Sequence, residues 1–143
     1  GGSSPQELLI PVIQVKTTKR RKQTEFAKII PISKYQKITN LIMSFDFIQQ
    51  EALSDTVIPA DYQVFFESET GEKITNVALY RADKKDKEPE KRIFRLQFNF
   101  RNKKYDRSEK YYMVIRNENN GEELLRDQIF IDIAFSDNFG FNF

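Results

Sequence analysis

The sequence predicts an all-β domain built as a β-sandwich of about seven strands. Short stretches of alternating apolar and polar residues recur along the chain, and turn-forming residues separate them at regular intervals. No long apolar pattern with the 3.6-residue period of a helix lies between these stretches. Together the three observations favour two packed sheets, with a small β-barrel as the alternative.

The first residues are expected to lie ahead of the sandwich. Ser4 is a suitable N-cap, Pro5 is tolerated in the first turn and Glu7 completes a capping box, so a very short helical turn is predicted. Residues 8–15 are apolar and rich in β-branched side chains, and they predict one extra strand in which Pro11 marks an edge or a bulge. If no sheet of its own accompanies this strand, we expect it to pair with an exposed edge, either on its own sandwich or on a neighbouring copy, which would promote self-association.

The sandwich strands are expected at 26–32, 38–48, 62–67, 74–80, 92–100, 111–116 and 125–135. Alternation predicts which side chains face the core. In three of these stretches the inward residues are Leu41, Met43, Phe45 and Phe47; Phe94, Leu96, Phe98 and Phe100; and Ile129, Ile131, Ile133 and Phe135.

Loops are expected between these strands. Residues 49–60 contain Pro59, and residues 81–91 are almost wholly charged, so both are predicted to be exposed connections. Asn120-Gly121 favours a tight hairpin turn, because both residue types readily adopt positive φ.

Regular strands without helices are typical of sandwiches of the immunoglobulin or fibronectin type. Tyr111 and Tyr112, at the start of a late strand, would suit the tyrosine corner of such sandwiches. We therefore predict two regions: residues 1–23, which end an upstream unit and include a basic linker, and residues 24–143, which form the sandwich and an aromatic tail.

The residue inventory argues against catalysis. The chain has no His and no Cys, which removes the commonest general base, the thiol nucleophile and the preferred zinc ligands. Two carboxylate pairs, Asp83 with Asp86 and Asp127 with Asp132, are weak candidates for a divalent ion. We therefore predict no catalytic residue, no metal site and no cofactor in this chain.

Charge gives little support for nucleic-acid binding. Lys and Arg total 23 and Asp and Glu total 21, a net charge of +2. Residues 16–23 are locally basic and fit either a solvated linker or an anion contact, with help from Arg101, Lys103 and Lys104. The candidate contact residues are Lys16, Lys19, Arg20, Arg21 and Lys22.

The last eight residues carry three aromatic side chains around one glycine. They predict either a final strand on the sandwich edge or a docking segment made of Phe139, Phe141 and Phe143. No apolar run approaches the roughly 20 residues that span a bilayer, and no signal peptide is visible, so a cytoplasmic location without membrane contact is expected.

The two ends resemble a known family. Residues 1–13 (GGSSPQELLIPVI) resemble the end of the catalytic domain in PglZ-type members of the alkaline phosphatase superfamily, where a His precedes the two glycines. Residues 111–117 and 131–135 look like the closing strands of PglZ proteins from BREX phage-defence systems. The resemblance implies a C-terminal region whose parent is a metal-dependent phosphohydrolase, with the metal-binding His lying just before Gly1.

On this basis we expect a non-catalytic C-terminal domain that serves as a structural or protein-interaction module. The expected partners are the upstream phosphatase domain of the parent and other phage-defence proteins. A free-standing carbohydrate- or nucleic-acid-binding sandwich is the alternative. Sugar binding is disfavoured because the chain has no Trp, and it would need Tyr35, Tyr62 or Tyr105 exposed together in one groove.

Overall fold

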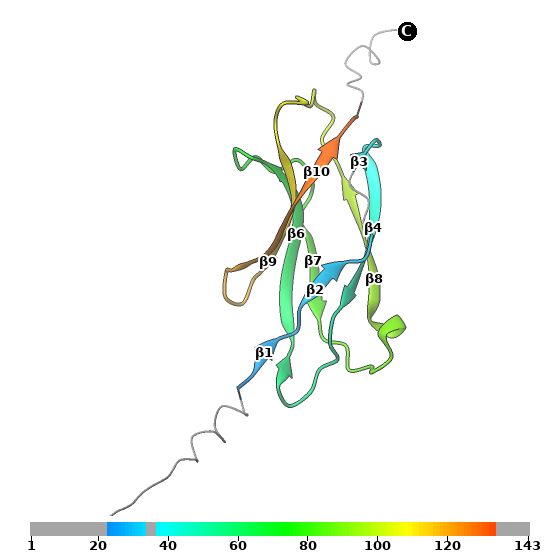
Figure 1. The fold of residues 1–143 in the computed structure, drawn as a ribbon, viewed down its shortest axis with the longest axis vertical. Coiled ribbons are helices and arrows are strands. Elements are labelled where there is room, and N and C mark those ends of the chain that lie inside the picture. Colours follow the sequence, from blue (N-terminus) through cyan, green and yellow to red (C-terminus); the bar gives the residue numbers. More distant parts are fainter. Residues whose placement is uncertain (1–22, 34–36, 134–143) are drawn as a thin grey trace, which may run out of the picture.

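The computed structural model describes residues 23–33 and 37–133, and this part of the chain is built almost entirely of β-strands (Figure 1). A single short 3-10 turn, η1 (Pro89–Arg92), precedes the eighth strand. The strands are β1 (Glu25–Phe26), β2 (Ile29–Pro31), β3 (Lys37–Ile38), β4 (Ile42–Gln49), β5 (Val57–Ile58), β6 (Ala60–Ser68), β7 (Ala78–Ala82), β8 (Ile93–Asn99), β9 (Tyr111–Asn117) and β10 (Glu123–Ile131). The expected all-β class is confirmed.

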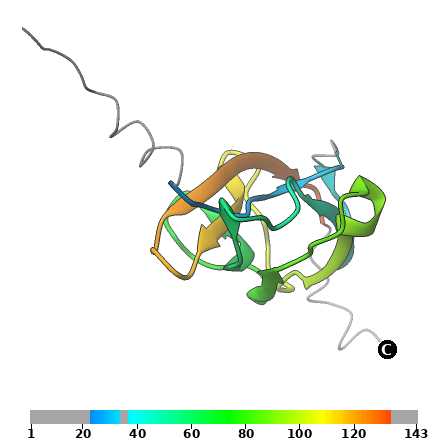
Figure 2. The same ribbon diagram turned by 90° about the horizontal axis from the view of Figure 1, so that it is seen from below.

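Two larger sheets organise these strands. One has five strands in the order β3-β10-β9-β6-β7, and the other has three in the order β2-β4-β8. Neighbours in both sheets are antiparallel, except that β3 runs parallel to β10. A small parallel pair, β1 with β5, lies at one end of the molecule. Viewed nearly along the strands in Figure 2, the sheets curl around one interior.

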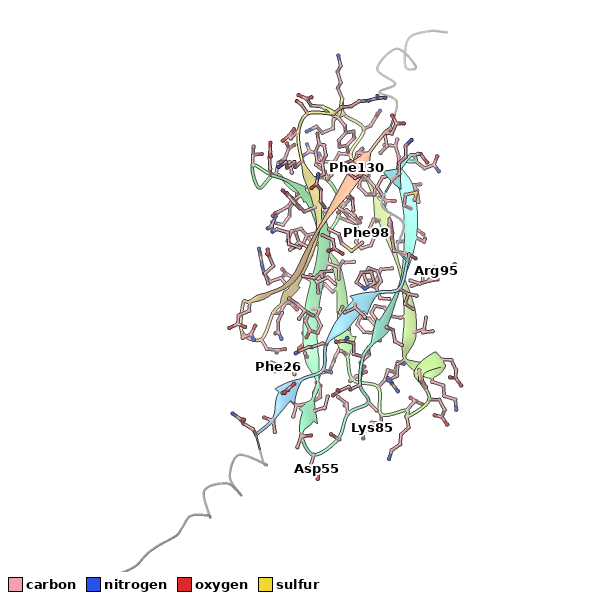
Figure 3. The ribbon with its side chains drawn as sticks, in the orientation of Figure 1. Phe26, Asp55, Lys85, Arg95, Phe98 and Phe130 are labelled. Atoms are coloured by element: carbon pink, nitrogen blue, oxygen red, sulfur yellow. The ribbon has the colours of Figure 1, made fainter. Side chains whose placement is uncertain are left out.

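Aromatic side chains from both sheets meet in that interior. Phe66 of β6 lies 5.5 Å from Phe45 of β4 and 5.0 Å from Phe98 of β8, measured between ring centroids. The Phe66–Phe98 pair is edge-to-face, a favourable geometry for aromatic rings. All three are buried, and Figure 3 shows Phe98 directed into the interior. The inward faces predicted for 38–48 and 92–100 are therefore confirmed.

Several predicted strand boundaries are wrong. At these places the apolar pattern continues along the sequence, but the strand with which the chain pairs changes. The expected strand 26–32 is two strands, since β1 pairs with β5 and β2 pairs with β4. The expected strand 38–48 divides in the same way, because β3 joins β10 whereas β4 joins β2 and β8. The predicted loop 49–60 contains β5 and the start of β6.

The predicted strand 74–80 begins only at Ala78. The residues before it bridge neighbouring strands instead of joining one ladder. The backbone N–H of Ile74 donates to Phe66 O, and Ile74 O accepts from Arg101 N. Thr75 Oγ1 accepts a hydrogen bond from the backbone N–H of Phe66, and Thr75 also pairs with Phe100 in an isolated bridge.

The predicted loop 81–91 begins two residues too early, because Arg81 and the buried Ala82 belong to β7. The rest of the charged loop is mostly exposed, as expected, but a buried cation holds its backbone. Arg92 is only 7% exposed. Its Nη1 donates to the carbonyl oxygens of Asp86 and Lys87, its Nε to Gln49 O and its Nη2 to Gln50 O, at 2.9–3.0 Å. The fully buried Gln49 side chain adds bonds to both the N–H and the carbonyl of Lys84. Two buried polar side chains thus fasten the loop to the end of β4.

Tyr111, the first residue of β9, ties the preceding loop to the sheet. Its hydroxyl accepts a hydrogen bond from the backbone N–H of Asp106 at 3.1 Å and lies 3.2 Å from Glu109 Oε1. Tyr105 packs edge-on against the Tyr111 ring, and its own hydroxyl donates to Arg101 O. Burial raises the pKa of Tyr105 to about 12 and also raises the pKa of Tyr111, so both tyrosines stay neutral at physiological pH.

The hairpin between β9 and β10 turns at Gly121, which has φ of +75°. A Cβ added at this position would meet no atom within 4 Å, so only the backbone conformation disfavours a side chain. We expect Gly121→Ala to lower the free energy of unfolding by about 1–2 kcal/mol, because a left-handed conformation is costly for alanine. Gly121→Asn should cost less, because asparagine tolerates this conformation. Equal losses in urea denaturation of the two variants would contradict this explanation.

Candidate functional site

The candidate contact residues named from the sequence lie outside the described residues. This holds for the basic residues Lys16, Lys19, Arg20, Arg21 and Lys22 and for the aromatic residues Phe139, Phe141 and Phe143. Both groups remain predictions. Tyr35 of the sugar-binding alternative also falls in an undescribed stretch.

In each carboxylate pair considered for a metal ion, one member has a basic neighbour. Asp83 lies 3.7 Å from Arg81, and Asp132 lies between Lys37 at 3.4 Å and Arg107 at 3.1 Å. Within residues 23–33 and 37–133, no three acidic side chains gather closely enough to hold a metal ion. The divalent metal implied by the phosphatase resemblance therefore finds no fitting donor set in this part of the chain.

The residues that were expected to help bind nucleic acid or sugar have structural contacts. Arg101 and Lys103 both reach Glu72, at 3.3 and 3.1 Å, so one carboxylate offsets part of their charge. The Tyr62 ring is buried, and its hydroxyl donates to Ala27 O at 2.6 Å. Tyr62 is therefore not available to stack on a sugar, so it does not meet the condition that the sugar-binding alternative required.

The outer face of the five-stranded sheet carries a small second core. Phe65 of β6 and Val114 of β9 are paired across the sheet and fully buried, although they point away from the main interior. Lys73 Nζ lies 4.9 Å from the centroid of the Phe65 ring, and the Arg116 guanidinium lies 5.4 Å from it. Long basic side chains therefore cover this apolar pair and place positive charge over it.

An ion-pair network lies beside this covered pair. Arg126 Nη2 donates to Glu67 Oε2 at 2.6 Å and to Glu123 Oε2 at 2.8 Å. These hydrogen bonds raise the pKa of Arg126 and lower the pKa of Glu123. The arrangement fixes Arg126 above the Tyr112 ring, 5.1 Å from its centroid, so most of its donors are already used within the sheet.

The outer face of the three-stranded sheet is more apolar. Ile30 of β2 lies opposite Ile48 of β4, and Ile48 lies opposite Ile93 of β8, so three isoleucines form one row across the sheet. We call these three residues the isoleucine row. Ile93 is 45% exposed. Next to the row, Arg95 forms an ion pair with Asp46 at 2.8 Å, and this contact lowers the pKa of the Asp46 carboxyl.

A shallow cavity of about 210 Å³ lies where β10 ends. Its lining includes Tyr111, the exposed Phe130, and the ion-pair group of Lys37, Arg107 and Asp132. The charged groups on its rim already bind one another. The Tyr111 hydroxyl in its lining donates to Glu109 and accepts from the backbone N–H of Asp106, so it holds the preceding loop.

Sequence reasoning missed the buried polar residues Arg92 and Gln49, the covered Phe65–Val114 pair and the isoleucine row. Of these features, only the covered Phe65–Val114 pair and the isoleucine row could have been suspected from the sequence. Phe65 and the three isoleucines occupy outward positions of alternating strands, where polar residues are usual.

Comparison with known proteins identifies a protein related to this chain. No family model matches the chain. Over 146 aligned residues the chain is 32% identical to "Alkaline phosphatase-like protein PglZ" of Bacillus cereus (strain H3081.97), and the match covers 99% of the chain. The predicted resemblance to PglZ-type proteins is confirmed. The match spans 17% of the PglZ relative, so the chain corresponds to a small part of that protein.

The PglZ match includes nearly all of the chain, so it extends well beyond the two end stretches on which the resemblance was first based. No helix in the described part of the structure combines the length and the apolar character needed to cross a bilayer.

Proposed function

We propose that the chain is the non-catalytic C-terminal domain of a PglZ-type, alkaline phosphatase-like protein that acts in BREX phage defence. In this proposal the domain is a structural or protein-interaction module and works in the cytoplasm. Its partners are the upstream phosphatase domain of the parent and other phage-defence proteins. Metal-dependent hydrolysis belongs to the parent, and residues 1–23 connect the two units.

We assign the domain to the immunoglobulin or fibronectin type of sandwich. If β2, β4, β6, β7, β8, β9 and β10 are lettered A, B, C, C′, E, F and G, the three-stranded sheet is A-B-E and the larger sheet contains G-F-C-C′. This division of strands matches that of immunoglobulin-like domains, except that strand D has no counterpart among residues 23–33 and 37–133. The Tyr111 hydroxyl at the start of strand F, bonded to the backbone five residues upstream, supports the assignment as a tyrosine corner.

The observation that carries the proposal is the alignment of almost the whole chain with a small part of a PglZ protein. The side chains support a non-catalytic role, because the buried polar groups serve the fold. Gln49 and Arg92 hold a loop, and Glu67 binds Arg126. The outer faces offer exposed aliphatic side chains such as Leu79 and Ile93, which suit contact with protein.

The purified chain is expected to show no phosphatase activity with any divalent metal, because the family's ligands and nucleophile would lie upstream of Gly1. The measurement is hydrolysis of p-nitrophenyl phosphate with Mg²⁺, Mn²⁺ or Zn²⁺, compared with a mock purification. Metal-dependent turnover above that control would overturn the non-catalytic assignment.

A gel mobility shift at low and high salt tests the nucleic-acid alternative. If the basic linker binds nucleic acid, a mobility shift should be seen at low salt and should disappear at high salt, because contacts with phosphate groups make binding strongly salt-dependent. We expect no shift at physiological salt. A shift that is lost when Lys19, Arg20 and Arg21 are replaced by Ser would favour the alternative instead.

A further inference from the structure

An apolar hollow lies beside β5, at the end of the sandwich where the described chain begins. It has a volume of about 340 Å³. Four half-buried apolar residues line it, with the exposed Lys85 beside them: Leu53, Val57, Ile58 and Pro59. We call these four residues the entry hollow. Their partial exposure leaves apolar surface open to contact with another protein surface.

The first described strand lies next to the entry hollow. β1 pairs in parallel with β5, and Glu25 lies opposite Val57. Neighbouring strands in a sheet are about 4.8 Å apart. Figure 3 shows Phe26, Asp55 and Lys85 at the same end of the molecule. Whatever precedes Glu25 on the polypeptide therefore joins the domain within one strand spacing of the hollow.

The loops that form the hollow are fixed by hydrogen bonds. Leu53 N donates to Lys84 O at 2.9 Å, which ties the loop before β5 to the loop after β7. Ser54 Oγ accepts from two backbone N–H groups in the turn that leads into β5. Gln49 and Arg92 fasten the same two loops to the end of β4. A surface that is ordered in advance loses little conformational entropy when a partner binds.

We propose that the entry hollow is the docking surface for the unit that precedes this domain in a PglZ-type parent. An apolar side chain of that unit would fill the hollow. The exposed Asp55 and Lys85 beside it would face polar groups of the partner, as at the rim of other protein interfaces. The inference rests on the proposed function, because it takes the upstream unit of the parent as the partner.

The tether between the two units is short. The resemblance implies that residues 1–13 end the upstream unit, so residues 14–24 alone connect it to β1. We call residues 14–24 the tether. Fully extended, it spans at most about 40 Å. β6 runs from this end of the sandwich to the other over nine residues, about 30 Å, so reaching the far end would use most of the tether.

Tethering also favours the upstream unit over a second copy. A short linker gives the attached unit an effective concentration in the millimolar range, far above that of a separate molecule in dilute solution. The PglZ match includes 99% of this chain but 17% of the relative. That relative therefore carries the counterpart of the entry hollow on the same polypeptide as a much larger remaining part.

Hydrogen exchange of the isolated chain and of the full-length parent tests the contact without any substitution. We expect the amides of residues 53–58 to exchange about ten-fold more slowly in the parent, because docking would suppress local opening. Residues 101–110, in the loop at the opposite end of the sandwich, should exchange equally in both proteins.

Two outcomes of this comparison would overturn the proposal. Both proteins contain the tether, so equal exchange at residues 53–58 would mean that the hollow is open or is covered by the chain itself. Protection in the parent around Leu79 or along β8, in place of residues 53–58, would assign the contact to another face. Neither outcome depends on the phosphatase assay, so failure of the docking surface leaves the non-catalytic assignment intact.

A substitution tests the same contact through proteolysis of the tether in the full-length parent. Leu53→Glu places a charge in the hollow, whereas the control Leu79→Glu changes an exposed leucine on β7 in the same way. A segment restrained at both ends is a poor protease substrate, so undocking should accelerate cleavage. The tether offers trypsin five basic residues: Lys16, Lys19, Arg20, Arg21 and Lys22.

We expect Leu53→Glu to accelerate tryptic cleavage of the tether about five-fold and Leu79→Glu to leave its rate unchanged. Equal rates in the two variants would contradict the docking surface. Urea denaturation of both variants in the isolated chain checks that each is folded. If Leu53→Glu does not fold, the exchange comparison of the unsubstituted proteins decides the question by itself.

Discussion

Replacing Phe98 with alanine is expected to lower the free energy of unfolding by about 3–5 kcal/mol, or to prevent folding. Phe98 is fully buried and touches rings from both sheets: Phe45 on its own sheet and Phe66 on the other. Truncation would leave a cavity at the point where the sheets join. Urea denaturation followed by circular dichroism measures the loss.

The neighbouring Gln97 supplies the control for Phe98. It is exposed on the opposite face of the same strand, so Gln97→Ala should change the free energy of unfolding by no more than about 0.5 kcal/mol. If both variants unfolded at the same urea concentration as the wild type, Phe98 would not be part of the core.

Replacing Arg92 with methionine is expected to cost about 3 kcal/mol, because it removes the donors of four buried or partly buried hydrogen bonds while keeping much of the side-chain volume. The carbonyls of Asp86, Lys87, Gln49 and Gln50 would lose their partner. Because the loop 81–91 would also be released, trypsin should cleave after its lysines before the rest of the domain unfolds. Denaturation and timed proteolysis measure the two effects.

Arg95 is the matched control for Arg92, because it lies only three residues further along the chain but is exposed. Its ion pair with Asp46 is accessible to solvent, and such pairs contribute little. Arg95→Met should therefore change stability by less than about 1 kcal/mol and leave loop cleavage unchanged. Equal effects of the two variants would show that the buried contacts of Arg92 do not hold the loop.

Alternation in the sequence was enough to predict the all-β class and the inward faces of the longest strands. Phe45 and Phe47 on β4, and Phe98 on β8, face the core as expected, because a strand places successive side chains on opposite faces. Strand boundaries were harder to predict. An apolar pattern continues through Phe26 and Ile29, yet the two belong to different sheets, and pairing across the sequence decides where a strand ends.

Buried polar contacts were not predictable from the sequence. Arg92 closes a run of charged residues, and nothing in that run distinguishes it from Lys91. Its role depends on backbone carbonyls that come from Gln49 and Gln50, more than forty residues earlier. The candidate contact residues were chosen from local charge and aromaticity, and they fall in stretches that the structure does not describe.

The parallel pairing of β3 with β10 has a consequence for synthesis of the protein. Lys37 and Ile38 lie opposite Phe130 and Ile131, so one of the first strands completes its ladder with the last. A ribosome that has synthesised residues up to Asn117 has supplied both β3 and β9 but not β10, the strand that lies between them in the sheet. The larger sheet therefore closes only after nearly the whole described chain has emerged, which is typical of folds dominated by distant contacts.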